Sequence, residues 1–112
     1  MDRASVIASC LGLRAASQGQ PFGPDVLVFK VGGKIFAILG EDSVSLKCDP
    51  HLALALRETY ASIQPGYHLN KRHWNTVALD GSVPDDELRE WIEESYALAA
   101  ASLTRAQRAE LS

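Results

Sequence analysis

The sequence predicts an α+β fold in which an antiparallel five-stranded sheet is covered by helices on one face. Two kinds of observation predict it. Short apolar runs flank turn residues such as the Gly-Gly of "VGGK", a pattern typical of β-hairpins. Longer amphipathic segments with capping residues, such as "DPHLALALRETY", indicate helices between and after these runs. The predicted order is helix, three strands, helix, two strands and two helices, in a single domain spanning residues 1–112.

The first predicted helix begins after Asp2, which can cap it. Its apolar stripe consists of Val6, Ile7, Cys10 and Leu11. The following segment, "ASQGQPFGPD", holds two glycines and two prolines, so we expect it to be a loop.

Residues 25–49 read as three strands joined by "VGGK" and "GEDS". A two-residue Gly-Gly turn would place Val31 opposite Lys34 and Phe29 opposite Phe36. Because opposed residues share a face, this register predicts a core face made of Val26, Val28, Ile35, Ala37, Leu39, Val44, Leu46 and Cys48, with Lys30 near the turn. The other, open face would then carry Leu27, Phe29, Val31, Lys34, Phe36, Ile38, Ser45 and Lys47.

A second helix over residues 49–60 is predicted by the N-cap Asp49 and by Pro50 at its first position. "GYHLN" and "WNTVAL" then form the last predicted hairpin. A three-residue "KRH" loop would put His68, Asn70, Trp74 and Thr76 on the open face. A two-residue loop would shift this register by one, and we favour the first because it separates apolar from polar residues better.

The longest predicted helix starts near Pro84, and Asp85, Asp86 and Glu87 suit its positive N-terminal end. "TRAQRAEL" opens with a capping box and predicts a short final helix. The net charge is −3, but residues 1–79 carry +2 and residues 80–112 carry −5. We therefore expect two surfaces of opposite sign.

Four segments together resemble the MmcQ/YjbR family: "FKVGGKIFAIL", "VSLKCDP", "PGYHLNKRHWNTVALDG" and "VPDDELREWIEESYALA". The similarity runs from about residue 22 to residue 103 and is most specific in the PGYH-x-NK-x-HW stretch. The resemblance implies the CyaY-like, or double-wing, fold and a family described as DNA-binding. It implies no particular reaction and no cofactor.

The open face combines aromatic and cationic residues, a mixture suited to stacking on bases and contacting phosphates. Together with the resemblance, it leads us to expect a nucleic-acid-binding site formed by Lys34, Phe36, Lys47, His68, Asn70, Lys71, Arg72, His73 and Trp74. The alternative is that the same aromatic face forms a protein-interaction or homodimerisation surface.

Other functions are less favoured by the residues. His68 and His73 lack a third ligand nearby, so no metal site is predicted. Ser95, His68 and Asp80 are the residue types of a catalytic triad, but the chain has no nucleophile elbow to support one. It also has no phosphate-binding glycine loop, so we expect neither an enzyme nor a cofactor. No apolar run reaches the roughly 18 residues of a membrane span. With only two cysteines, we expect a cytoplasmic protein, either monomeric or a weak homodimer.

Overall fold

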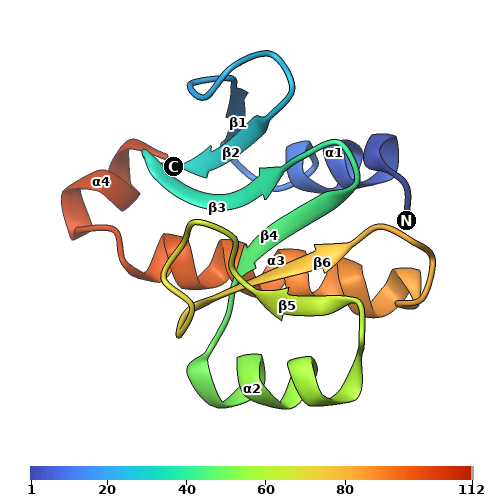
Figure 1. Ribbon diagram of the computed structural model, residues 1–112. Coiled ribbons are helices and arrows are strands. Elements are labelled where there is room, and N and C mark those ends of the chain that lie inside the picture. The colour runs from blue at the N-terminus through green and yellow to red at the C-terminus, as the bar shows by residue number, and fades with distance from the viewer. Residues whose placement is uncertain (112) are drawn as a thin grey trace.

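The computed structural model describes residues 1–111, which form one antiparallel sheet and four helices (Figure 1). The sheet has six strands in the order β1-β2-β3-β4-β6-β5, not the five that were predicted. In chain order the elements are α1 (Arg3–Leu11), β1 (Ala16–Gly19), β2 (Leu27–Val31), β3 (Lys34–Leu39), β4 (Ser43–Lys47), α2 (Pro50–Thr59), β5 (Ile63–Pro65), β6 (Trp74–Ala78), α3 (Asp85–Ala101) and α4 (Arg105–Glu110).

α1 and α3 cover one face of the sheet. α3 crosses behind β3 and β4, with α1 beside it and α2 along the β5–β6 edge (Figure 1). Val6 and Cys10 of α1 and Leu88 and Ile92 of α3 are buried in the core against the strands. The opposite face of the sheet is the open face. Among the described residues, no helix combines the length and apolar character needed to cross a membrane.

A β-bulge at Phe36 changes which residues face the core. The Gly-Gly turn forms as predicted, with positive φ at Gly32 and Gly33, and Val31 pairs with Lys34. Beyond Lys30, however, the register shifts by one, so Phe29 pairs with Ala37 rather than with Phe36. Phe36 is the extra residue of the bulge.

The shift reverses the predicted faces of β2. Leu27, Phe29, Val31 and Phe36 join the core on the helical face. Val26, Val28 and Ile35 were predicted on that face but lie on the opposite one, where Val28 is nevertheless buried. Burying two phenylalanines accounts for the preference: the Phe36 ring packs 6.4 Å from Phe29 and edge-on to Tyr96 at 5.4 Å. The predicted core residues of the β3–β4 pair, Ala37, Leu39, Val44 and Leu46, are confirmed.

The sixth strand, β1, lies where a loop was predicted. Its sequence, "ASQG", has no apolar alternation, and three of its four residues are exposed. It forms because the β2 edge offers unpaired backbone groups, with which Ala16–Gly19 pair in register. A short polar strand of this kind also protects the edge of the sheet.

The fifth strand also differs from the prediction. It covers Ile63–Pro65 rather than the "GYHLN" segment, and Ile63 pairs with Val77 in the core. Pro65 ends this edge strand, where its missing N–H costs no ladder hydrogen bond. Residues 66–73 therefore form a loop, which passes in front of the open face in Figure 1.

Candidate nucleic-acid interface

β4 and β6 bring a lysine and a tryptophan together on the open face. Lys47 pairs with Trp74 across the ladder, and two residues further along Ser45 pairs with Thr76. The hydroxyls of Ser45 and Thr76 are hydrogen-bonded at 2.7 Å. The predicted positions of Lys47, Trp74 and Thr76 on the open face are therefore confirmed. The bulge brings Lys30 of β2 to this face as well.

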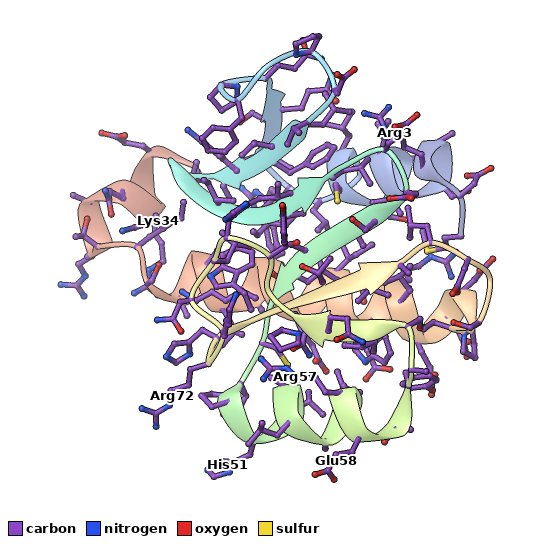
Figure 2. All side chains as sticks on the ribbon, viewed as in Figure 1. Arg3, Lys34, His51, Arg57, Glu58 and Arg72 are labelled. Atoms are coloured by element: carbon purple, nitrogen blue, oxygen red, sulfur yellow. The ribbon has the colours of Figure 1, made fainter. Side chains whose placement is uncertain are left out.

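Two residues of the predicted site do not belong to this surface. Phe36 was expected on the open face, but its side chain is completely buried against the helices because of the bulge. Lys34 pairs with Val31, whose side chain lies in the core, so Lys34 sits on the helical side of the hairpin end. Figure 2 shows Lys34 well apart from Arg72.

The loop of residues 66–73 is tied closely to β6 by its own backbone. The Gly66 N–H donates to the Trp74 carbonyl at 2.8 Å, and the Tyr67 N–H donates to the Thr76 hydroxyl at 3.0 Å. A Cβ atom at Gly66 would lie only 2.6 Å from the Cβ of Trp74. Glycine at this position therefore lets the loop fold directly onto the strand.

Arg57 of α2 fixes the other end of this loop. Its guanidinium donates to the carbonyl oxygens of Lys71 and Trp74 and, at 2.7 Å, to the side-chain oxygen of Asn75. Asn75 is buried and donates in turn to the Ala53 carbonyl at 3.3 Å. Figure 2 shows Arg57 between α2 and the strands, whereas His51 and Glu58 of the same helix point away from them.

The remaining predicted site residues lie in this loop rather than on a strand. His68 is exposed, has a φ of 57°, and its ring centroid lies 4.0 Å from that of Tyr67. The Asn70 side chain accepts from the Arg72 N–H at 2.9 Å and so shapes the turn. The Lys71 ammonium donates to the Gly66 carbonyl at 3.0 Å.

Arg72 is exposed at the tip of the loop and points into solvent in Figure 2. His73 is half-buried, and its carbonyl accepts from the Cys48 N–H at 2.7 Å. The Arg72 side chain is thus exposed to solvent, while the side chains of Asn70 and Lys71 stabilise the conformation of the loop.

Sequence reasoning missed two residues that position this site, Arg57 and Asn75, and interpreted a third, Ser95, only as an inward-facing packing residue of its helix. Arg57 sits in the last turn of a helix, where an arginine is ordinary, and its partners lie 14 to 18 residues away. Asn75 gave a weak signal, because it is polar at a strand position that alternates with the open-face residues Trp74 and Thr76. A buried asparagine in a strand normally has specific hydrogen-bond partners.

Ser95 of α3 joins β3 to β4 next to the bulge. Its buried hydroxyl donates to the Phe36 carbonyl at 2.6 Å and accepts from the Lys47 N–H at 2.8 Å. The hydroxyl thus bridges the two strands just beyond their last pair, Ala37 with Leu46. It therefore fixes the backbone position from which the Lys47 side chain extends to the open face.

Ser95 and His68 lie on opposite sides of the sheet (Figure 1). Ser95 is bonded on the helical side, His68 lies in the loop over the open face, and Asp80 accepts from the Ser82 N–H. Burial, with Glu94 and Asp49 nearby, raises the pKa of Cys48 to about 11, which disfavours its thiolate. Among residues 1–111 no three His, Cys, Asp or Glu side chains are grouped to hold a metal ion.

Comparison with known proteins finds a matching family model and several similar proteins. The model of the family named YjbR matches residues 11–98. The chain is 40% identical over 89 residues to the uncharacterized protein YbdF of Escherichia coli O157:H7, covering 76% of this chain and 73% of that one. It is 34% identical over 112 residues to the uncharacterized protein YjbR of Escherichia coli K12, covering 96% and 95% of the two chains.

Solved structures have the same fold. A crystal structure of a Deinococcus radiodurans protein superposes with a TM-score of 0.91 at 38% identity, over 98% of this chain and 87% of that chain. A crystal structure of a Pseudomonas syringae protein superposes with a TM-score of 0.78 at 29% identity, over 88% of this chain and 99% of that chain.

Proposed function

The chain belongs to the YjbR family, and we propose that it is a non-enzymatic protein that binds nucleic acid through the open face of its sheet. The observation that carries this proposal is the pairing of Lys47 with Trp74 on a face that no described helix covers. A cation beside an aromatic ring can contact a phosphate while the ring stacks on the adjoining base.

The distribution of charge supports this choice of face. Lys30 and Lys47 lie on the open face and Arg72 projects beside it, while Asp85, Asp86, Glu87, Glu90, Glu93 and Glu94 all belong to α3 behind the sheet. Six of the 14 acidic residues thus lie behind the sheet, away from the proposed site. A polyanion approaching the open face meets a locally cationic surface.

The proposed roles follow from these positions. Lys30, Lys47 and Arg72 contact phosphates, and the half-buried Trp74 provides a stacking platform. Lys71 and Asn70 act mainly by shaping the loop, since their polar groups are bonded within it. Phe36 and Lys34 have no part in the site.

A second candidate function is a protein-interaction or homodimerisation surface on the same face. Tyr67 favours it, because 72% of this large aromatic side chain is exposed. Salt distinguishes the two functions: phosphate contacts release counterions, whereas an apolar interface responds little to salt.

The test is a fluorescence-anisotropy titration of labelled single- and double-stranded DNA at 50 and 200 mM salt. Three phosphate contacts predict that single-strand affinity falls about 20-fold over this range. Absence of DNA binding at the lower salt concentration would refute the proposed function. A concentration-dependent dimer that salt does not disturb would support the second candidate.

The finer fold type and the cellular location are also proposals. Helices on one face of an antiparallel sheet support the CyaY-like, or double-wing, type. The thiols of Cys10 and Cys48 are both free, which supports a reducing compartment such as the cytoplasm.

A further inference from the structure

A pocket of about 250 Å³ lies on the open face beneath the loop of residues 66–73. Ile38, Ser45 and Thr76 belong to its floor, and Tyr67 and Leu69 of the loop form a wall. Gly40, which follows β3, lines one end. Because Thr76 is two residues from Trp74 on the same face of β6, the pocket directly adjoins the proposed stacking platform.

The loop holds this pocket open rather than collapsing into it. The Tyr67 N–H bonds the Thr76 hydroxyl, and the Leu69 N–H bonds the Gly66 carbonyl at 3.3 Å. Arg57 and Lys71 fix the loop at its base. The positive φ of His68 turns the chain between the two wall residues, an uncommon conformation for a residue other than glycine. Binding in such a preformed pocket requires little ordering of the protein.

The chemistry of the walls selects a flat ring with polar edges. Aliphatic side chains and the Tyr67 ring offer apolar surface. The hydroxyls of Ser45 and Thr76 bond each other, which leaves one O–H donor and free lone pairs for a ring edge. None of the described side chains that line the pocket is cationic, and the exposed carboxylates Glu41 and Asp42 follow Gly40 at its end. A phosphate is therefore disfavoured inside it, whereas the cations Lys47 and Arg72 lie toward the Trp74 side.

We propose that this pocket takes one unstacked nucleobase of a single-stranded nucleic acid, while a neighbouring base stacks on Trp74. The inference rests on the proposed function and adds the class of ligand. In a duplex the bases are paired and stacked, so a base can enter the pocket only from a single strand or after costly extrusion. The protein then prefers single strands to duplexes of the same length.

The structure offers a variant that fills the pocket without disturbing the fold. Leu39 points into the core, so a side chain at Gly40 points toward the open face. A Cβ atom at Gly40 would make ordinary contacts only, at 3.6 Å to the Ser43 carbonyl oxygen and 3.7 Å to its hydroxyl. Gly40→Leu therefore occupies the pocket. Gly19→Leu on β1 is the matched control, because its Cβ would meet only the Pro21 ring at 3.9 Å.

The experiment measures binding of a labelled single-stranded oligonucleotide, the matching duplex and a free nucleoside monophosphate to the wild type, Gly40→Leu, Gly19→Leu and Trp74→Ala. Thermal melting confirms that each variant is folded. We expect Gly40→Leu to lower single-strand affinity about tenfold, which is on the order of the stacking free energy of one base. The preference for single strand over duplex should become smaller. Gly19→Leu retains wild-type affinity.

The outcomes separate this inference from the proposed function. If Trp74→Ala weakens single-strand binding but folded Gly40→Leu does not, the pocket inference is wrong and the proposed function stands. If the wild type binds neither oligonucleotide, both are wrong. Binding of the free nucleotide alone, lost in Gly40→Leu, would overturn the polymer assignment in favour of a small-nucleotide site.

Discussion

Lys47 and Trp74 lie directly opposite each other on adjacent strands of the open face. Hydrogen bonds from other elements hold the backbone of both residues in place. The Lys47 N–H is held by Ser95 of α3, and the Trp74 carbonyl accepts from both Gly66 and Arg57. The pair is therefore held from both sides of the sheet, as a preorganised binding surface requires.

Replacing Arg72 with alanine should reduce nucleic-acid affinity and its dependence on salt. Arg72 is exposed, and no hydrogen bond of its side chain within the described residues would be lost. Removing one phosphate contact lowers the slope of log affinity against log salt by about 0.7 for a single strand. The measurement is an anisotropy titration at four salt concentrations. Arg105→Ala, an exposed arginine on α4, is the control, and an equal effect of both variants would contradict the placement of the site.

Ser95→Ala should destabilise the fold through two backbone groups, the buried Phe36 carbonyl and the partly buried Lys47 N–H. It leaves the Phe36 carbonyl and the Lys47 N–H without their shared partner. Each unsatisfied buried group costs about 1–3 kcal/mol. Urea denaturation of wild type and variant measures the loss. Ser17→Ala on β1 is the control: its side chain is exposed and makes no hydrogen bond within the described residues, so stability should change by at most about 0.5 kcal/mol. A neutral Ser95→Ala would show that the bulge does not depend on this hydroxyl.

Arg57→Met should loosen the loop of residues 66–73. The substitution keeps the apolar stem but removes the donors to Lys71, Trp74 and Asn75. Hydrogen exchange should then accelerate at Gly66 and Trp74, while the α3 amides keep their protection. Glu58→Ala is the control on the same helix, since Glu58 points away from the strands in Figure 2. Unchanged exchange in the loop would show that Arg57 is not its anchor.

The Cys48 thiol should react slowly at neutral pH. Burial chiefly, and then the carboxylates of Glu94 and Asp49, raise its pKa to about 11, so the reactive thiolate is scarce at pH 7. The rate of disulfide exchange should rise about tenfold per pH unit between pH 7 and pH 10.

Glu94→Gln sharpens this test of Cys48. Removing a neighbouring negative charge favours the thiolate, lowers the pKa and accelerates the reaction at pH 8. Cys48→Ser reports any background from Cys10, whose burial raises its own pKa to about 12. A rate that levels off near pH 8.5 would contradict the assigned environment.

Local signals predicted the helices and the first turn well. Asp49 accepts from the N–H groups of His51 and Leu52, and Thr104 forms its capping box with Gln107, as their residue types indicate. The Gly-Gly turn adopts its predicted geometry. These features depend on interactions between residues a few positions apart, which the sequence displays directly.

The errors arose where distant residues decide the structure. The bulge at Phe36 depends on packing against Tyr96 and on the Ser95 hydroxyl, both in α3. One inserted residue in the pairing was enough to move Phe36 from the open face to the core. The β1 strand has no apolar pattern of its own, and the loop of residues 66–73 takes its shape from Arg57 in another element.

The most direct test of the proposed surface is an amide and indole NMR titration of the protein with a short single-stranded oligonucleotide at low salt. Our account predicts shifts of the Trp74 indole N–H and of the Lys47, Thr76 and Arg72 amides, with the exposed outer residues of α3 unaffected. Shifts centred on α3 or α1, or none at saturating oligonucleotide, would contradict nucleic-acid binding by the open face.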